Sequence, residues 1–303
     1  MSFLYLLEKI RVPGLNELML AVTQLGEETA FLVIALIVFW CVDKRKGYFL
    51  MSVGFLGTMA NQFLKLLCRV PRPWVRDPDF TILEQAREAA SGYSFPSGHT
   101  QTAVGSFGCL AVTTKKRWVK ILCAIIMVLV PFSRMYVGVH TPADVLVGAG
   151  MALALIWLLK PVVYLEDGKG MKPLLAAMIA LTVLFLLFVE LWQFPEDMDE
   201  ANLASGYKNA YTLLGCLVGV AMVYIADEKW LHFPVEAKWW VQIIKAAVGL
   251  VLVLAVKEGL RSPLEALFGG HMAARAVRYF LVVIVAGALW PMSFSWFSKL
   301  GKK

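Results

Sequence analysis

The sequence contains little charge. Charged residues make up 17% of its 303 residues, whereas about a quarter is usual in a soluble protein. Hydrophobic residues reach 59%, and the mean hydropathy is +0.68. This composition excludes a disordered chain, a coiled coil and a secreted disulfide scaffold. It predicts a protein that crosses a membrane several times.

The sequence also lacks a cysteine pattern that binds metal. It has five cysteines, none of which forms a CxxC pair, and each lies in or beside an apolar run. The odd number and this placement argue against a disulfide framework and a zinc site. We interpret the cysteines as small buried apolar side chains. They are Cys41, Cys68, Cys109, Cys123 and Cys216.

The net charge of +7 raises the question of a nucleic-acid partner. The basic residues, however, form short clusters between apolar runs. That pattern is typical of loops held on one side of a bilayer. We therefore expect membrane lipids around the protein and no nucleic acid bound to it.

Apolar runs long enough to cross a bilayer, about 20 residues each, occur roughly nine times. They lie near residues 22–42, 47–68, 97–114, 118–136, 142–164, 172–192, 209–227, 239–257 and 274–298. The first 16 residues place Lys9 and Arg11 among leucine and isoleucine, which predicts a short interfacial helix. The expected fold is therefore an all-α, polytopic membrane helix bundle of about nine transmembrane helices.

Basic clusters alternate between the connections of these runs. They include Lys44–Lys46, Lys115–Lys120, Lys160–Lys172 and the C-terminal Lys299, Lys302 and Lys303. The positive-inside rule places such clusters in the cytoplasm, and the acidic connection Glu196–Glu200 suits the opposite side. We therefore expect the N-terminus outside and the C-terminus inside. The basic residues of the eighth connection, Lys257, Arg261, Arg275 and Arg278, fit this topology least well.

Charged residues fall within several of the apolar runs. A charge at the bilayer centre costs about 2.5–3.5 kcal/mol, so Lys65, near the end of the second run, requires a specific reason. For Glu28, Glu190 and Lys245 we expect interfacial positions or pairs between helices.

Three segments concentrate polar residues at expected helix ends. Lys65 precedes Arg72 by seven residues, and Pro71 and Pro73 are expected to end that helix. The second segment is Pro96–His99. There Ser97 can cap the next helix, and Gly98 lets a ligand approach the backbone.

The third segment contains Ser133-Arg134 and then His140–Asp144. Thr141 can cap a helix whose first position is Pro142, which places His140 at its N-terminus and Asp144 in its first turn. All three segments fall on the expected outer side, so they can converge.

If the three segments converge, their side chains and helix ends form a site suited to a phosphate dianion. Lys65, Arg72 and Arg134 supply cations, and two helix N-termini supply free N–H groups. A histidine oriented by a carboxylate can act as a nucleophile, and a second histidine can protonate the leaving oxygen. No acidic cluster with the character of a Mg²⁺ site accompanies these groups.

The three segments resemble the motifs of the type 2 phosphatidic acid phosphatase (PAP2) superfamily: K-x6-RP, PSGH and SR-x5-H-x3-D. The resemblance covers roughly residues 20–165. It implies a nucleophile at His140, a general acid and base at His99, and Asp144 orienting His140. It further implies that Lys65, Arg72, Ser97, Gly98 and Arg134 hold the phosphate, with no metal and no cofactor. The topology is similar to a membrane branch with bacterial lipid phosphatases, sphingosine-1-phosphate phosphatase and glucose-6-phosphatase.

We therefore predict an integral membrane phosphatase that hydrolyses a phosphomonoester or diphosphate of a lipid. The active site would face outside, in the cell membrane. Residues 1–165 would form the phosphatase core, with the interfacial helix and five transmembrane helices. Residues 166–303 would add about four helices, which could shape a lipid pocket or form a homodimer face.

Three alternatives stay open at this point. The same phosphohistidine could pass phosphate to an acceptor other than water, which would make the protein a phosphotransferase. The substrate could be a soluble sugar phosphate. A transporter or lipid-binding protein could also keep a phosphate site, although binding alone needs the cations and not His99, His140 and Asp144. The outer loop Trp74–Phe95 mixes aromatic and charged residues, which suits either a lid over a lipid headgroup or an ordinary surface loop.

Overall fold

The structure is a computed structural model that describes residues 1–90 and 92–300. Lys302 and Lys303, part of the expected C-terminal basic cluster, lie outside the described residues. Within the described part, every regular element is helical and none is a strand, which confirms the all-α prediction. The α-helices are α1 Ser2–Lys9, α2 Pro13–Gln24, α3 Glu28–Cys41, α4 Lys44–Cys68, α5 Pro73–Arg76, α6 Gly98–Thr113, α7 Arg117–Tyr136, α8 Pro142–Val163, α9 Met171–Leu191, α10 Glu200–Ala226, α11 Trp239–Gly259, α12 Arg261–Leu267, α13 Ala273–Ile284 and α14 Phe294–Phe297.

Six helical stretches of the described chain are long and apolar enough to cross a membrane. They are Arg117–Tyr136, Pro142–Val163, Met171–Leu191, Glu200–Leu231, Trp239–Leu267 and Ala273–Phe297. The bent pair α2 and α3 makes a seventh if it is counted as one span. The protein is therefore a multi-pass membrane protein. The remaining two expected runs coincide with α4 and α6, which are helical but do not belong to this set.

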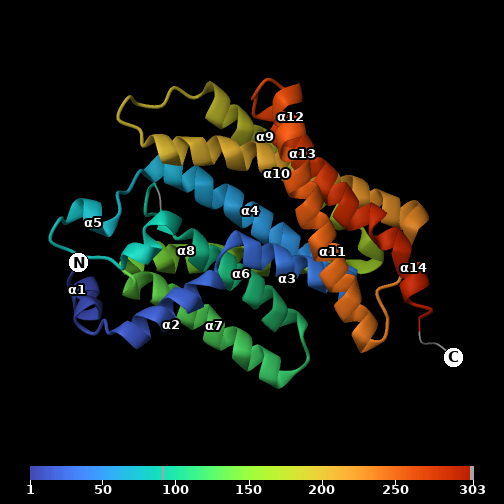
Figure 1. Ribbon diagram of the computed structural model, residues 1–303, viewed down its shortest axis with the longest axis horizontal. Coiled ribbons are helices and arrows are strands. Elements are labelled where there is room, and N and C mark those ends of the chain that lie inside the picture. Colours follow the sequence, from blue (N-terminus) through green and yellow to red (C-terminus); the bar gives the residue numbers. More distant parts are fainter. Residues whose placement is uncertain (91, 301–303) are drawn as a thin grey trace. The chain divides into compact units, whose positions relative to one another are not determined.

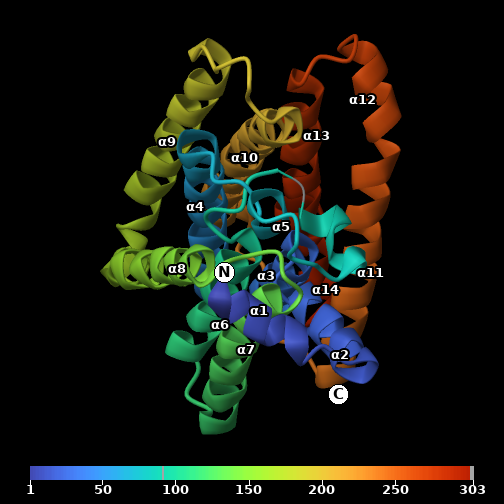
Figure 2. The ribbon, with the colours of Figure 1, turned by 90° about the vertical axis from the view of Figure 1, so that its left-hand side faces the viewer.

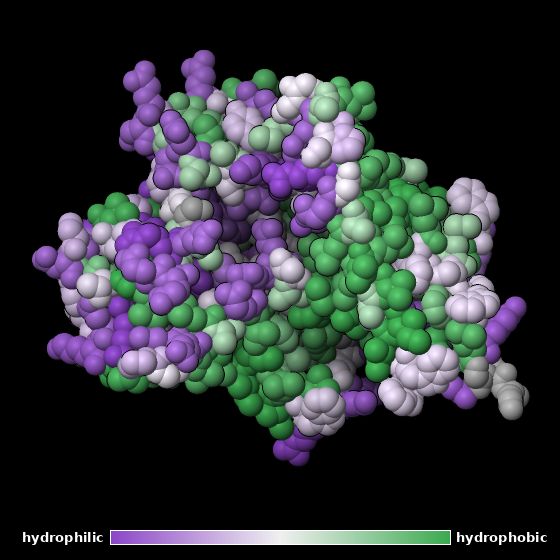
Figure 3. All heavy atoms as spheres, in the orientation of Figure 1, coloured by the Kyte–Doolittle hydropathy of each residue, from purple (hydrophilic) through white to green (hydrophobic). Residues whose placement is uncertain are grey.

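Apolar side chains cover much of the surface, as the face in Figure 3 shows. On α8, for example, Leu146, Leu153 and Trp157 are all exposed. A soluble protein rarely exposes apolar areas of this kind, whereas lipid chains can cover them. The exposed faces of these helices therefore suit a bilayer.

The chain divides into two compact units. The first contains residues 1–32, 50–160 and 193–206. Within it, α6 and α7 pack side by side (Figures 1 and 2), and α2 packs on α7. Met19 of α2, Ala86 and Ala90 of the outer loop, and Val137 and Val139 after α7 form one buried cluster. This cluster holds the turn that carries His140.

The N-terminal residues form two helices where one short interfacial helix was expected. Helix α1 ends at Lys9, and α2 begins at Pro13. Helix α1 packs on the outer loop, where Leu4 is buried with Phe80 and Ile82. The Arg11 guanidinium donates to the carbonyl of Tyr136 at 2.9 Å. The first residues therefore pack against the loop before α6 and the end of α7.

A sharp corner replaces the expected continuous first span. Helices α2 and α3 meet at 51°, and Gly26 lies between them. A Cβ atom at this position would lie 2.7 Å from the carbonyl oxygen of His99 and 2.9 Å from Val130 Cγ1. Only glycine allows this close approach without a shift of the backbone. The corner thus contacts the start of α6, and the run near 22–42 did not reveal it.

The capping predictions for α6 and α8 are confirmed. Ser97 is the N-cap of α6, and its hydroxyl accepts from the Thr100 N–H at 3.4 Å. Helix α8 begins at Pro142, and Thr141 and Asp144 bond reciprocally in a capping box. Helix α4 ends at Cys68, three residues before Pro71, so Lys65 and Arg72 do not share one helix.

The second unit contains residues 33–49, 161–192 and 207–303. Two of its charged residues have partners between helices. The Lys245 ammonium is 1% exposed, donates to the carbonyls of Trp40 and Val235, and lies over the Phe294 ring. Glu190 accepts from the Tyr211 hydroxyl at 2.8 Å. Lys245 is therefore paired within the helix packing, whereas Glu190 is exposed and accepts its hydrogen bond at the surface.

Candidate active site

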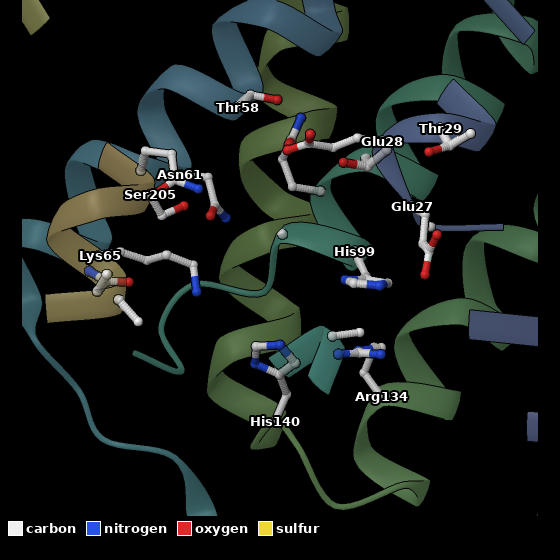
Figure 4. Close-up of a pocket in the computed structure, with 18 of the residues that line it drawn as sticks. Glu27, Glu28, Thr29, Thr58, Asn61, Lys65, His99, Arg134, His140 and Ser205 are labelled. Carbon is white, nitrogen blue, oxygen red and sulfur yellow. The ribbon is translucent and has the colours of Figure 1, made fainter. Parts of the chain in front are cut away.

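A polar pocket of about 290 Å³ lies within the first unit. Six of the eight predicted site residues line it: Lys65, Arg72, Gly98, His99, Arg134 and His140. They come from α4, the segment after it, the start of α6, the end of α7 and the turn before α8. Figure 4 shows both histidines with Lys65 and Arg134 in this pocket. The structure thus brings together the three separate segments.

His140 occupies a polar environment that fixes its tautomer. Its Nε2 atom lies 3.0 Å from Arg72 Nη1. A guanidinium only donates hydrogen bonds, so Nε2 must be the acceptor and the ring proton belongs on Nδ1. Nδ1 lies 3.5 Å from Asp144 Oδ2. The nitrogen that faces Arg72 therefore has a lone pair.

Ser94 links His140 to Asp144, and the sequence did not point to it. Its hydroxyl donates to Asp144 Oδ2 at 2.6 Å and lies 3.4 Å from His140 Nδ1. Asp144 also accepts from the Thr141 N–H at 2.7 Å. The carboxylate is thus held in place behind the histidine, buried, and away from the pocket wall.

The surroundings of His140 favour the neutral imidazole. The side chain is 2% exposed, and burial, followed by the charges of Arg72, Arg134 and Lys65, holds the pKa of His140 well below its usual value. Burial also lowers the pKa of Arg72, to about 10, so this guanidinium stays charged at neutral pH. A neutral imidazole beside a cation is suited to attack on a phosphate.

The cations are anchored by backbone carbonyls. Lys65 Nζ donates to the carbonyl of Tyr93 at 2.5 Å. Arg72 donates to the carbonyls of Gly92 and Val139 at 3.0 and 2.9 Å. These bonds position both cations without neutralising them, because a carbonyl carries no full charge.

Arg134 keeps buried donors without a partner among the described residues. Its Nη1 atom donates to Thr23 Oγ1 at 2.7 Å, while Nε and Nη2 have no acceptor. His99 Nε2 is likewise buried and unpaired. Unpaired buried donors are costly, and the oxygen atoms of a phosphate would satisfy them.

The start of α6 suits an anion. Its first residue, Gly98, lines the pocket, and a Cβ atom there would meet only Asn61 Oδ1, at an ordinary 3.6 Å. Packing within the protein therefore does not demand glycine at this position, whereas a ligand close to the backbone would. Ser97 is fully buried behind it, and its N–H donates to the carbonyl of Asp144 at 3.0 Å.

The pocket also contains residues that sequence reasoning missed. Thr58, Asn61 and Gln62 line it from α4, on the same helical face as Lys65. Their helical spacing from Lys65 could have predicted that they share its face. Asn202 and Ser205 line it from the first turns of α10, and no sequence signal connected them with the motifs.

Little of the outer loop Trp74–Phe95 reaches the pocket. Of the residues of this loop that the structure describes, Ala89 alone belongs to the lining, and Phe80, Ala86 and Ala90 are buried in the packing of the first unit. Among the described residues, no group of three histidine, cysteine or acidic side chains is placed to hold a metal ion.

Two family models match the chain. One, described as the PAP2 superfamily, matches residues 45–166. The other, described as the transmembrane extension of PAP2 superfamily phosphatases, matches residues 211–303. Residues 193–206 and the corner at Gly26 lie outside both matches.

Three curated proteins illustrate the similarity. Phosphatidylglycerophosphatase B of Bacillus subtilis is 33% identical over 50% of this chain and 76% of its own length. Undecaprenyl-diphosphatase of Sulfolobus acidocaldarius is 30% identical over 46% of this chain and 66% of its own. Sphingosine-1-phosphate phosphatase 2 of Homo sapiens is 25% identical over 77% of this chain and 61% of its own.

Proposed function

The chain belongs to the PAP2 superfamily, and from this premise we propose that it is a membrane enzyme that hydrolyses a lipid phosphomonoester or diphosphate on the outer face. The names of its relatives include phosphatases of lipid phosphates and of a lipid diphosphate. Those names support a lipid substrate. The reaction would pass through a phosphohistidine.

In the first step, His140 Nε2 attacks phosphorus. The N–P bond forms as the bond between phosphorus and the leaving oxygen breaks, and His99 gives its proton to that oxygen. In the second step, His99 takes a proton from water, the water oxygen bonds to phosphorus, and the N–P bond breaks. Inorganic phosphate is released and His140 is restored.

The observation that carries this proposal is the lone pair on His140 Nε2. Arg72 donates a hydrogen bond to this nitrogen, while Asp144 and Ser94 lie at the other ring nitrogen, Nδ1. When a phosphate enters, Arg72 can transfer its hydrogen bond to a phosphate oxygen. His140 Nε2 then no longer accepts a hydrogen bond, and its lone pair can attack the phosphorus atom.

The proposed topology has nine spans, an outer N-terminus and an inner C-terminus. It requires α4 and α6 to cross the membrane, in addition to the stretches described above. Ion pairs between connections support it. Lys44 pairs with Asp227, and Lys172 with Glu228, and all four lie on the proposed inner side. Arg69 pairs with Asp197, and both lie on the proposed outer side, with the site.

The test is phosphate release by purified His140→Ala protein in detergent. We expect a loss of at least about 10³-fold, because the nucleophile is removed, with an unchanged elution volume and helix content. His271→Ala is the matched control, since this exposed loop histidine is not part of the pocket lining, and it should keep full activity. Wild-type turnover in the His140→Ala protein would refute the phosphohistidine.

A further inference from the structure

The pocket extends beyond the residues that hold phosphate. Glu27, Glu28 and Thr29 line it from the corner between α2 and α3, and Thr58 and Gln62 line it from α4. We call these five residues the distal compartment. Thr58 lies seven residues before Lys65, which is about 10 Å along a helix. In Figure 4, His99 lies between His140 and the acidic side chains of the distal compartment.

The chemistry determines which part of a substrate faces this compartment. In an in-line displacement, the leaving oxygen lies opposite the attacking atom. With His140 as the nucleophile and His99 as the proton donor, the leaving group extends away from His140 and past His99. The first atoms of the leaving alcohol therefore enter the distal compartment.

An unpaired buried amide lies beside this compartment. Gln101 is 1% exposed and lines the pocket, and its Nε2 atom has no hydrogen-bond partner among the described residues. A Cβ atom at Gly57 would lie 1.7 Å from Nε2, so the amide lies against α4 next to Thr58. A buried donor without a partner points to a ligand that supplies an acceptor.

The pocket has room for more than a phosphate group. Its volume of about 290 Å³ corresponds to about ten water molecules at ~30 Å³ each. Outside the phosphate-binding cations, most lining side chains are carboxylates, hydroxyls and amides, alongside Gly26, Ala89 and Ala201. Such a lining suits a hydroxylated or cationic group and not an acyl chain.

We propose that the distal compartment binds the leaving alcohol and selects its chemistry. It favours phosphomonoesters whose alcohol carries hydroxyl or ammonium groups close to the ester oxygen, because Glu27 and Glu28 accept from such donors. It disfavours diphosphates, because their leaving group is itself an anion and would face two carboxylates. This inference rests on the proposed phosphatase function.

The first experiment compares four substrates with the full-length purified enzyme in detergent. They are dihydrosphingosine 1-phosphate, lysophosphatidic acid, hexadecyl phosphate and farnesyl diphosphate. The first two carry an ammonium or hydroxyl group near the phosphate, the third carries neither, and the fourth has an anionic leaving group. We expect kcat/KM for the first two to exceed that for the others by about 10- to 100-fold.

The second experiment uses the double variant Glu27→Gln and Glu28→Gln. The preference for dihydrosphingosine 1-phosphate over farnesyl diphosphate should fall by about tenfold or more, because the carboxylate charges are removed. Glu17→Gln is the matched control, since Glu17 is exposed on α2 and outside the pocket, and it should keep the wild-type preference. If the double variant does not fold, Thr58→Val should lower the same preference.

The two proposals fail differently. Equal or better turnover of hexadecyl phosphate or farnesyl diphosphate would overturn the role of the distal compartment while leaving the phosphatase intact. An unchanged preference in the double variant would do the same. Release of phosphate from none of the four substrates would instead refute the proposed function.

Discussion

At the scale of single residues, the state of His140 decides whether the site can work at neutral pH. Burial and three neighbouring cations hold the pKa of this imidazole well below its ordinary value, about 6.5. As the pH falls through 6.5, a free imidazole gains its proton, whereas His140 should stay neutral. Its reactivity should therefore persist to a lower pH than that of a free imidazole.

Diethyl pyrocarbonate tests this prediction, since it reacts with the neutral form of an imidazole and not with the protonated form. The modification of the peptide that contains His140 is followed by mass spectrometry from pH 4.5 to 8, with N-acetylhistidine in the same tube as the reference. We expect the midpoint for His140 to lie below that of the reference. A midpoint equal to or above the reference would contradict the described environment.

The sequence indicated the residue types at the site, but not how they are connected. Spacing and helix capping were enough to expect Lys65, Arg72, His99, Arg134 and His140 near one another. Ser94 was not expected, because a serine near a turn has many ordinary roles. Its importance depends on a three-dimensional contact with Asp144, which lies 50 residues later.

At the scale of helices, the sequence predicted the helix starts that are determined by capping residues. Ser97, Thr141 and Pro142 mark helix starts because capping depends on neighbouring residues alone. The corner at Gly26 was missed because its cause is a contact with His99, far along the chain. The end of α4 at Cys68 agrees with the expected run near 47–68, whereas the left-handed conformation of Arg69 that follows it, with φ 49°, is not predicted by its residue type.

The first turn of α10 provides a prediction at this scale. Asn202 is 3% exposed, accepts from the Tyr93 N–H through Oδ1 at 3.4 Å, and leaves Nδ2 without a partner among the described residues. Because it lines the pocket, we expect Nδ2 to donate to the bound substrate. Asn202→Ala should raise KM about fivefold, the value of one hydrogen bond.

Lys208→Ala is the control for this variant, since Lys208 is exposed on the same helix, and its KM should equal that of the wild type. Asn202→Asp separates binding from packing, because it keeps the size of the side chain but replaces the donor by an acceptor. If Asn202→Asp binds substrate as tightly as the wild type, the donated hydrogen bond does not exist.

At the scale of the whole molecule, the distribution of charge supports the proposed orientation in the membrane. The connections proposed inside carry Lys44–Lys46, Lys115–Lys120 and Lys160–Lys172, as the positive-inside rule requires. The eighth connection, proposed outside, also carries basic residues, but several have partners. Lys257 pairs with Glu258, Arg261 with Glu265, and Arg275 donates to Thr212. Pairing reduces the number of unpaired charges that would have to cross the membrane.

Single cysteines test this topology in intact cells, starting from a variant without the five native cysteines. Asp79→Cys, Asp197→Cys and Gly270→Cys lie in the connections proposed outside, and a membrane-impermeant maleimide should label them directly. Lys115→Cys and Lys169→Cys lie in connections proposed inside and should react only after the cells are permeabilised. Labelling of Asp79→Cys only after permeabilisation would place the pocket on the cytoplasmic side. Labelling of Gly270→Cys only after permeabilisation would show that the last helices do not complete nine spans, because an outer eighth connection requires that number.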